Sequence, residues 1–469
     1  MSYADGRTAQ GRPTGRERAT TRRPAARGGV YGRGAARAVY PLGVSELVVM
    51  KFGGTSVADA QRIKRAARRI AERRESGARV VAVLSARGKT TDELLAMAEE
   101  VSAAPDPREL DMLLSTGERI SCALCAMALH DMGHSARSFT GSQAGIVTDA
   151  SHTKARILDV RAERIRAALD EDQIVLVAGF QGVSTATHDV TTLGRGGSDT
   201  TAVAVAAALG AEVCEIYTDV AGVFSADPRV VPGARKLAVV SFEEMLEMAA
   251  SGAGVLQLRS VEYARNHGVR IHCRSSFEDG PGTVVVSEGE NMDHVERPLI
   301  TAVTHSTSEA MVTLLGVEHR PGVAAGLFEA LAEAGVDVDM IDQNLPSGAG
   351  ERAEISFTVP REDLRAARAA LAPLAGDAYS ELVAQEEIGK VSIVGAGMRS
   401  HPGVAARVFR VLAEEGLNIE MISTSPIKIS CVIPRDRVES VVRALHAAFA
   451  LEGPGTIREE EPFRARGAG

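Results

Sequence analysis

Leu47-Val-Val-Met-Lys-Phe-Gly-Gly-Thr-Ser56 joins an apolar run to a glycine-rich segment, and a helical pattern of Arg, Ala and Ile then continues to about Gly77. The apolar run predicts a strand buried on both faces of a sheet. Adjacent glycines let a ligand approach the backbone, and the start of the next helix offers unpaired N–H groups to an anion. The loop is therefore either a phosphate site or a turn that needs glycine for its own geometry. The residue order of a P-loop is absent.

Three further apolar runs of the same kind follow, at 80–84, 174–178 and 213–217, and helical patterns separate them. Strands that are apolar throughout and alternate with helices are typical of a parallel sheet covered by helices. The sequence therefore predicts an α/β fold with a mostly parallel sheet covered on both faces.

The last third of the chain contains an internal repeat. A strand, a Pro-Gly loop, an amphipathic helix, a glycine and a second strand recur in the same order. The matching segments are 312–316 and 391–395, 321–325 and 402–406, 331–335 and 412–416, and 336–341 and 417–422. Because several segments match in register, we predict two α+β modules of about 80 residues each.

Composition excludes several classes of protein. The 469 residues predict two to four domains, and the net charge of −8 argues against a general nucleic-acid binder. The chain contains no run of about 18 consecutive apolar residues, so the sequence predicts no membrane span. Residues 1–45 hold nine arginines, no lysine and two acidic residues, with almost no apolar periodicity. They predict a disordered basic extension, and they lack the apolar region of a secretory signal.

The five cysteines are too few and too scattered for a disulfide framework and fit a reducing compartment. Cys122 and Cys125 form a CxxC motif inside an apolar helical pattern. We interpret them as core residues rather than as metal ligands or a redox pair.

A second glycine-rich segment, Thr191-Thr-Leu-Gly-Arg-Gly-Gly-Ser-Asp-Thr-Thr201, precedes an alanine-rich helical pattern. Asp199 could simply cap the helix. However, Arg195 between glycines offers a planar fork for a carboxylate or a phosphate, beside an acid and three hydroxyl groups. This segment predicts a site for a small charged ligand.

Two more segments carry polar residues at expected strand and helix ends. In Leu114-Ser-Thr-Gly-Glu-Arg-Ile-Ser121, Ser115 or Thr116 can cap a helix that has Glu118 in its first turn. The alternative role of Glu118 is to receive an ammonium group. The segment 217–229 leaves a buried strand through Asp, Gly and Pro residues, at the edge of a parallel sheet where ligands usually bind. Alternatively, the Asp and Pro residues of this segment serve only to form a turn.

Together these segments resemble the aspartate kinases of the amino-acid-kinase family, most closely the monofunctional kinases of actinobacteria. The resemblance runs from about Val44 to about residue 455. It rests on KFGGTSVAD (51–59), LLSTGERIS (113–121), FTGSQAG (139–145), VAGFQG (177–182), TTLGRGGSDTTA (191–202) and YTDVAGVFSADPR (217–229). The repeats resemble paired ACT regulatory modules, which have a βαββαβ, ferredoxin-like fold.

The resemblance implies a division into a basic extension (1–45), a kinase domain (46–296), a first ACT domain (297–386) and a second ACT domain with a disordered end (387–469). A start near Val44 is an alternative for the native N-terminus. The implied reaction converts ATP and L-aspartate to ADP and 4-phospho-L-aspartate, with Mg²⁺ as the companion of ATP. It is the first step toward lysine, threonine and methionine.

The resemblance also assigns roles to single residues. Lys51 and Asp199 would be catalytic, and Arg195 and Glu118 would bind the substrate's α-carboxylate and ammonium group. The other implied substrate contacts are Ser56, Thr91, Gly196, Gly197 and Ser198. The implied ATP site comprises Lys51, Phe52, Gly53, Gly54, Thr218, Asp219, Phe224, Ser225, Ala226, Asp227, Pro228 and Arg229. The implied effector site comprises Ala324, Asp337, Val338, Asp339, Gln343, Val404, Ala405, Asn418, Ile419 and Ser425. No resident metal site is implied.

Three residues depart from the family pattern. Gly254 replaces a lysine that contacts the nucleotide phosphates, Asp337 replaces an asparagine in the effector strand, and Pro426 replaces an acid. Loss of one charged hydrogen bond is worth roughly 1.5–3 kcal/mol, so we expect weaker ATP binding rather than inactivity. We also expect altered feedback by lysine and threonine. The alternative is a catalytically weak, kinase-like regulatory subunit that senses an amino acid.

The resemblance also implies partners and a location. They are L-aspartate, ATP and lysine or threonine effectors, with no nucleic acid and no membrane, in the cytoplasm. Since ACT modules pair side by side across subunits, the expected assembly is a homo-oligomer, or a heterotetramer with a short regulatory subunit.

Overall fold

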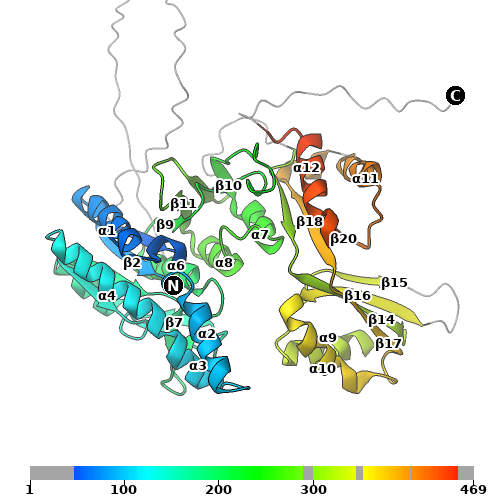
Figure 1. The fold of residues 1–469 in the computed structure, drawn as a ribbon, viewed down its shortest axis with the longest axis horizontal. Coiled ribbons are helices and arrows are strands. Elements are labelled where there is room, and N and C mark those ends of the chain that lie inside the picture. Colours follow the sequence, from blue (N-terminus) through cyan, green and yellow to red (C-terminus); the bar gives the residue numbers. More distant parts are fainter. Residues whose placement is uncertain (1–46, 289–298, 345–351, 402, 453–469) are drawn as a thin grey trace, which may run out of the picture. The chain divides into compact units, whose positions relative to one another are not determined.

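The computed structural model describes residues 47–288, 299–344, 352–401 and 403–452 (Figure 1). The extension predicted for 1–45 and the disordered end predicted beyond residue 452 lie outside the described residues.

An eight-stranded sheet carries the first part of the fold, and all its described strand pairs are parallel except β11 with β12. The predicted mostly parallel sheet is therefore confirmed. In sheet order the strands are β10 (Val239–Ser241), β12 (Thr283–Val286), β11 (Arg270–Ser275), β9 (Val213–Thr218), β1 (Leu47–Phe52), β2 (Arg79–Leu84), β6 (Ile174–Ala178) and β3 (Ala136–Phe139).

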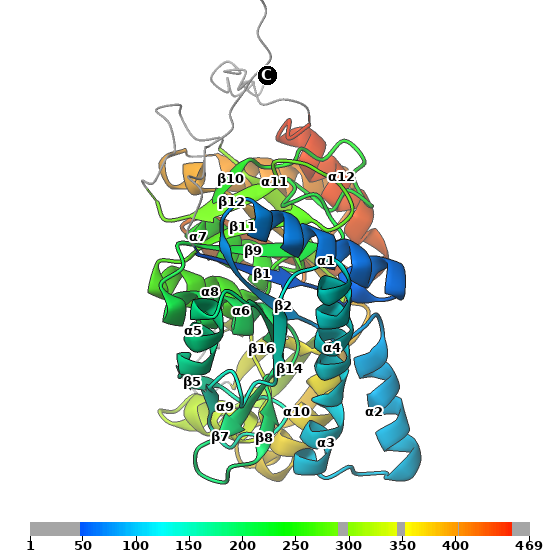
Figure 2. The ribbon, with the colours of Figure 1, turned by 90° about the vertical axis from the view of Figure 1, so that its left-hand side faces the viewer.

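Helices cover both faces of this sheet, as Figure 2 shows. Successive residues of β1 belong to different cores: Val48 and Met50 pack with α1 and α4, whereas Val49 packs with α5 to α8. The helices are α1 (Ala60–Glu75), α2 (Thr90–Val101), α3 (Pro107–Leu114), α4 (Thr116–Asp131), α5 (Glu163–Asp170), α6 (Gly197–Leu209), α7 (Phe242–Ala250) and α8 (Leu258–His267). A short 3₁₀ turn, η1 (Gly54–Val57), follows β1.

A separate four-stranded sheet is formed by strands that lie between β3 and α6 in the sequence. Its order is β5 (Ile157–Val160), β4 (Ile146–Thr148), β7 (Gln181–Ser184) and β8 (Val190–Thr192). β8 matters for the site, because it leads directly into the glycine-rich segment before α6.

The first repeat forms one antiparallel sheet in the order β15-β16-β14-β17, with two helices. The chain order of its elements is β14 (Glu309–Val317), α9 (Val323–Glu333), β15 (Ile341–Asn344), β16 (Ala353–Pro360), α10 (Leu364–Leu371) and β17 (Glu381–Gln385). This is the expected βαββαβ module.

The second repeat takes its fourth strand from elsewhere in the sequence. Its own elements are β18 (Ile388–Val394), α11 (Val404–Glu414), β19 (Met421–Ser425), β20 (Lys428–Pro434) and α12 (Val438–Ala448). The place that β17 has in the first module is filled by β13 (Ala302–Ser306), which pairs with β18 in the order β13-β18-β20-β19. This pairing differs from the predicted boundary between the two ACT domains at 386/387. β13 lies within the predicted first domain (297–386), but it belongs to the sheet of the second.

Contacts of α7 join the part of the chain that carries the eight-stranded sheet to the second module. Ser241 and Glu244 form a capping box at the start of α7. The Glu244 Oε1 atom also accepts hydrogen bonds from the Thr301 hydroxyl (2.7 Å) and the Ala396 N–H (3.1 Å). One carboxylate therefore fixes the helix start and two segments flanking β13 and β18.

Candidate active site

The carboxyl ends of β1 and β9 and the start of α6 bring the two predicted catalytic residues together. Lys51, the penultimate residue of β1, forms an ion pair with Asp199 in the first turn of α6, and their side chains are only 11% and 8% exposed. Gly196, not Asp199, occupies the N-cap position, so capping does not explain the acid. An acid near a helix N-terminus is favoured by the helix dipole. Asp199 therefore orients the Lys51 ammonium toward this edge of the sheet.

The first glycine loop is shaped by close backbone contacts. A Cβ atom at Gly54 would lie 3.0 Å from the Ala86 carbonyl oxygen, and the Gly88 N–H donates to the Gly54 carbonyl (3.0 Å). A Cβ at Gly53 would lie 3.5 Å from the Lys51 Nζ atom. The Gly53 N–H donates to the Tyr217 carbonyl at 3.2 Å. It is thus used within the fold, whereas Gly54 begins η1 and its N–H has no partner inside that turn.

Glu118 lies on α4 and is 3% exposed. Its Oε1 atom accepts a hydrogen bond from the Ala86 N–H (3.1 Å), and its buried Oε2 atom has no hydrogen-bond partner among the described residues. Burial raises the pKa of this carboxyl to about 7, against the smaller opposing effect of hydrogen bonds. A cationic group beside Oε2 would stabilise the charged form.

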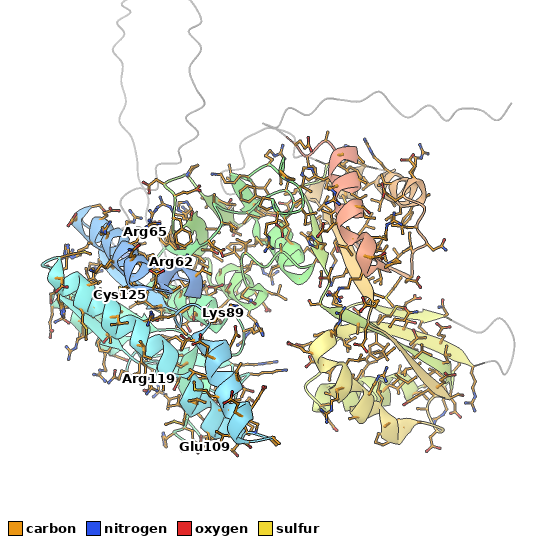
Figure 3. The ribbon with its side chains drawn as sticks, viewed as in Figure 1. Arg62, Arg65, Lys89, Glu109, Arg119 and Cys125 are labelled. Atoms are coloured by element: carbon orange, nitrogen blue, oxygen red, sulfur yellow. The ribbon has the colours of Figure 1, made fainter. Side chains whose placement is uncertain are left out.

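The turn before Glu118 is fixed by a polar network rather than by the expected cap. Ser115 precedes α4 but makes no side-chain cap, since its hydroxyl donates to the Met112 carbonyl instead (3.0 Å). Arg119, labelled in Figure 3, donates to the Ser115 Oγ atom (3.1 Å) and to the Gln181 side chain (3.3 Å). These contacts hold the helix start that carries Glu118.

The second glycine loop leaves the Arg195 side chain exposed. Gly194 and Gly196 have φ values of 76° and 71°, which only glycine adopts readily. The Arg195 side chain is exposed and makes no ion pair or hydrogen bond with the part of the chain that the structure describes. Its guanidinium is therefore available to an anionic ligand.

The remaining predicted substrate contacts occupy different environments. Ser198 is buried at the start of α6, where a Cβ at Gly179 would lie 2.7 Å from its hydroxyl. The Ser56 hydroxyl is hydrogen bonded to that of Ser276 (2.6 Å). Thr91 lies half-buried in the first turn of α2.

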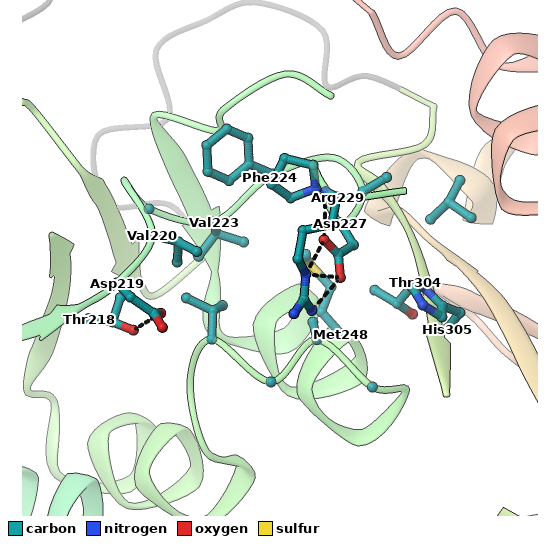
Figure 4. A pocket seen from close by; sticks show the side chains of 18 residues that line it. Thr218, Asp219, Val220, Val223, Phe224, Asp227, Arg229, Met248, Thr304 and His305 are labelled. Carbon is teal, nitrogen blue, oxygen red and sulfur yellow. Dashed lines mark hydrogen bonds and ion pairs between the residues drawn. The ribbon is translucent and has the colours of Figure 1, made fainter. Parts of the chain in front are cut away.

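A cavity of about 530 Å³ is lined by most of the residues predicted to bind ATP (Figure 4). The predicted residues that line it are Thr218, Asp219, Phe224, Ala226, Asp227, Pro228 and Arg229. In Figure 4 Thr218 and Asp219 lie on one side of the ion pair between Asp227 and Arg229, and Thr304 and His305 lie on the other. Arg229 holds the pKa of the Asp227 carboxyl below its usual value.

Two residues assigned to the ATP site have buried side chains with other roles. Phe52 is fully buried and stacks on Tyr217 with ring centroids 4.8 Å apart. Ser225 is also fully buried, and its Oγ atom is hydrogen bonded to His446 of α12 (2.9 Å). The assignment is therefore corrected for both side chains, because each packs inside the protein rather than in the cavity.

The loop 252–255, in which the family pattern had already singled out Gly254, lines the cavity, and so do two groups that the sequence did not predict: Met248, and Val303, Thr304 and His305 of β13. The loop packs closely on β13, since Gly252 has φ 103° and a Cβ there would lie 1.9 Å from the His305 carbonyl oxygen. Burial lowers the pKa of His305, while Asp227 opposes this effect. Only the long-range pairing of β13 brings these residues to the cavity.

Gly254 lies in this loop with no atom within 4 Å of its Cβ position. Lys236 does not line the cavity, and its Nζ atom lies 4.0 Å from the Cβ position of Gly280. Lys236 nevertheless forms an isolated β-bridge with Phe224, which does line the cavity.

Several predicted effector residues are engaged in the fold. Asp339 forms an ion pair with Lys390 of β18, and the Ser425 hydroxyl donates to Glu247 of α7 (2.9 Å). Val404 is 6% exposed. The exposed members are Asp337, Gln343, Ala405 and Asn418, and the half-buried ones are Ala324, Val338 and Ile419.

The CxxC pair has the predicted core role. Cys122 and Cys125 are buried in α4 against α1 and the sheet, and burial raises the pKa of the Cys125 thiol to about 12 (Figure 3). Residues Pro107–Asp131 are long and apolar enough to cross a membrane, but 56% of an apolar 18-residue window within them is buried in the fold, as in the core helices of globular proteins.

Comparison with known proteins identifies the family. The sequence profile of the amino acid kinase family matches residues 46–275, and that of an ACT domain matches 312–373 and 391–449. The aspartokinase of Mycolicibacterium smegmatis is 57% identical over 87% of this chain and 97% of its own length. The aspartokinase of Corynebacterium glutamicum is 52% identical over the same shares. The structure of E. coli aspartokinase III with aspartate and ADP has a TM-score of 0.73 and 28% identity, covering 86% of this chain and 99% of that one. The chain therefore belongs to the aspartokinases of the amino acid kinase family, with two ACT domains.

Proposed function

We propose that the chain transfers the γ-phosphoryl group of ATP to the side-chain carboxylate of L-aspartate, giving ADP and 4-phospho-L-aspartate. The observation that carries this proposal is the buried pair of Lys51 and Asp199 at the edge of the sheet, beside a cavity that holds the predicted nucleotide residues. The E. coli relative has been solved with aspartate and ADP, which supports both substrates.

The chemistry needs electrostatic stabilisation rather than a base. The attacking carboxylate has a free pKa of about 4 and is already ionised at neutral pH. The obstacle is repulsion between this anion and the anionic phosphoryl group, which positioned cations and N–H donors remove. Lys51 supplies the cation, and Gly54 at the start of η1 supplies a backbone donor. Gly53 is unsuited to this role, because its N–H already donates to Tyr217.

Mg²⁺ would arrive with the nucleotide. This ion is held mainly by substrate phosphates, water and one or two carboxylates. Asp219 fits that need: it lines the cavity, and its carboxylate accepts a hydrogen bond from the Thr218 hydroxyl (3.2 Å) rather than from a basic side chain. Asp199 and Asp227 are instead paired with Lys51 and Arg229. Bound Mg²⁺ would neutralise charge on the phosphates.

An assay of ADP release tests the function. Purified chain with ATP, Mg²⁺ and L-aspartate is expected to release ADP, and omission of aspartate or its replacement by glutamate is expected to abolish the release. Absence of turnover at saturating substrates would favour the alternative, a kinase-like regulatory subunit, for which Gly254 is the supporting feature.

Arg195→Ala is expected to raise the KM for aspartate by about tenfold or more while the KM for ATP changes little. A charged hydrogen bond to the α-carboxylate is worth roughly 1.5–3 kcal/mol, and Arg195 has no other partner among the described residues that its loss would disturb. Steady-state kinetics with each substrate varied in turn measures the effect. A change confined to the ATP KM would contradict the role of Arg195.

The KM for aspartate is expected to rise as the pH falls below 7. Glu118 has a pKa raised to about 7, so it is neutral below that pH and cannot pair with the substrate ammonium group. One essential ionisation gives about a tenfold change in kcat/KM per pH unit on the acid side. Glu118→Gln should bind aspartate weakly and remove this pH dependence. A wild-type profile that is flat between pH 5.5 and 8 would exclude Glu118 from substrate binding.

Feedback inhibition by lysine with threonine is expected to be weak. Asp337 adds a negative charge in the effector strand, Pro426 removes one, and Asp339 is already paired with Lys390. We expect the enzyme to keep most of its activity when both amino acids are present with saturating substrates. Strong concerted inhibition at millimolar levels would refute this proposal, and Asp337→Asn is the variant expected to strengthen the response.

We also propose an oligomer built through the ACT edges. β15 and β19 are the outer strands of their sheets, and the equivalent residues Ile341 and Ile422 are 55% and 45% exposed. An exposed edge strand offers unpaired backbone groups to a second chain. A homo-oligomer fits these edges, and so does a heterotetramer with a short regulatory subunit. We place the enzyme in the cytoplasm, where its substrates occur.

A further inference from the structure

The guanidinium of Arg259 binds backbone carbonyl groups rather than a carboxylate. It lies half-buried in the first turn of α8, and its two terminal nitrogens donate to the carbonyl oxygens of Leu193 (2.7 Å) and Ala155 (3.1 Å). It forms no ion pair within the described ranges of the chain. Burial lowers the pKa of the guanidinium, and nearby Arg156 adds to this effect. Partial burial of a cation costs free energy, which hydrogen bonds such as these two can offset.

The two carbonyl groups belong to the segments that frame the second glycine loop. Leu193 directly precedes Gly194, and the Ala155 N–H donates to the Thr192 carbonyl (2.9 Å). A Cβ at Gly194 would lie 3.2 Å from the Thr153 carbonyl oxygen. The segments 153–155 and 192–194 therefore lie side by side, and Arg259 links them through one planar group.

The same stretch of chain also limits the other end of the loop. Gln257, the N-cap residue of α8, packs on Gly196 so closely that a Cβ there would lie 1.9 Å from the Gln257 Cγ atom. Arg195 is thus flanked by a carbonyl bound to Arg259 on one side and by a glycine packed on Gln257 on the other. Its backbone is fixed while its side chain is free of the protein.

We propose that Arg259 is a positioning residue for aspartate: its two hydrogen bonds fix the backbone of 193–197 so that the Arg195 guanidinium meets the substrate carboxylate. This inference rests on the proposed function, in which Arg195 binds aspartate. Positioning matters because a small displacement of a charged group weakens a bidentate hydrogen bond to a carboxylate.

Arg259→Gln is expected to raise the KM for aspartate about tenfold while the KM for ATP stays within about twofold. Arg259→Lys should lie between Gln and the wild type, because one ammonium group cannot span both carbonyls as a planar fork does. Arg265→Gln is the matched control, since Arg265 is an exposed arginine on the same helix. It should behave as the wild type.

A double-mutant cycle with Arg195→Ala separates positioning from a general structural effect. If Arg259 acts through Arg195, Arg259→Gln will raise the aspartate KM in the wild type but not in the Arg195→Ala background. Equal effects in both backgrounds, or an unchanged KM in Arg259→Gln, would overturn the inference. If Arg195→Ala itself leaves the aspartate KM unchanged, the proposed substrate role fails instead. Should Arg259→Gln not fold, Arg259→Lys takes its place in the cycle with the same criteria.

Discussion

Lys51→Ala is expected to lower kcat by about two to three orders of magnitude, which is the effect of removing one preorganised group that stabilises transition-state charge. Lys51 is the cation held by Asp199 at the edge of the sheet, and the site is largely shielded from water. The lost stabilisation belongs to the transition state, so kcat and kcat/KM should fall together. Steady-state kinetics at saturating aspartate and ATP measures the change.

The fold should survive this substitution. Asp199 loses its partner but remains in the first turn of α6, where the helix dipole stabilises its charge. Lys64→Ala, an exposed lysine on α1, is the control and should keep full activity. Circular dichroism should match among the three proteins, and thermal unfolding of Lys51→Ala should remain cooperative, at a lower temperature because one partner of a buried ion pair is lost. A Lys51→Ala enzyme that retains most of its activity would remove Lys51 from the mechanism.

The predicted sheet was confirmed because the burial of its strands can be recognised from their own residues. Residues 47–50, 80–84 and 174–178 are apolar at successive positions, as a strand covered on both faces requires. The pairing of β13 had no such local signal. Ala302–Ser306 reads as a strand, but its partner β18 lies more than 80 residues along the chain. β13 pairs there because the second module, once folded, has an unpaired edge at β18, and this edge cannot be recognised from the residues of β13 alone.

The same distinction applies to the site. The motifs placed Lys51, Asp199 and the loop 218–229 at one edge of the sheet, because parallel strands end there together. They could not tell which side chains of a motif point inward. Phe52 and Ser225 stand within functional motifs, yet one stacks on Tyr217 and the other bonds to His446, a residue 221 positions away. Such roles are set by elements that the motif does not contain.

Lys390→Met is expected to destabilise the fold by about 3 kcal/mol, a typical effect of breaking a buried ion pair by removing one partner. Lys390 is 2% exposed and forms ion pairs with Glu309 (2.7 Å) and Asp339 of the first ACT module. It also donates to the carbonyl of Ala250, the last residue of α7 (3.4 Å). Burial alone would lower the pKa of this ammonium group, but the two carboxylates outweigh burial and raise it. The lysine is therefore charged at neutral pH, and its loss leaves Glu309 buried without a counter-ion.

Chemical denaturation at pH 7 measures this effect, with Arg443→Met as the control. Arg443 pairs with Glu439 four residues away on α12, and both side chains are more than half exposed. Such a pair contributes about 0.3–0.5 kcal/mol. If Lys390→Met is no more destabilising than this control, the buried cluster does not hold the two modules together.

The triple variant Lys390→Met, Glu309→Gln, Asp339→Asn then distinguishes a charge effect from a packing effect. Replacing every member of a buried ionic cluster removes the uncompensated charge, so much of the stability lost in Lys390→Met should return. Glu309 is 13% exposed and Asp339 is 44% exposed, so Glu309→Gln should account for most of the recovery. No recovery in the triple variant would mean that the stability lost in Lys390→Met comes from changed packing or from the lost hydrogen bond to Ala250 rather than from uncompensated charge. Because Asp339 is also a predicted effector residue, the triple variant should in addition lose any response to amino acids that depends on this carboxylate.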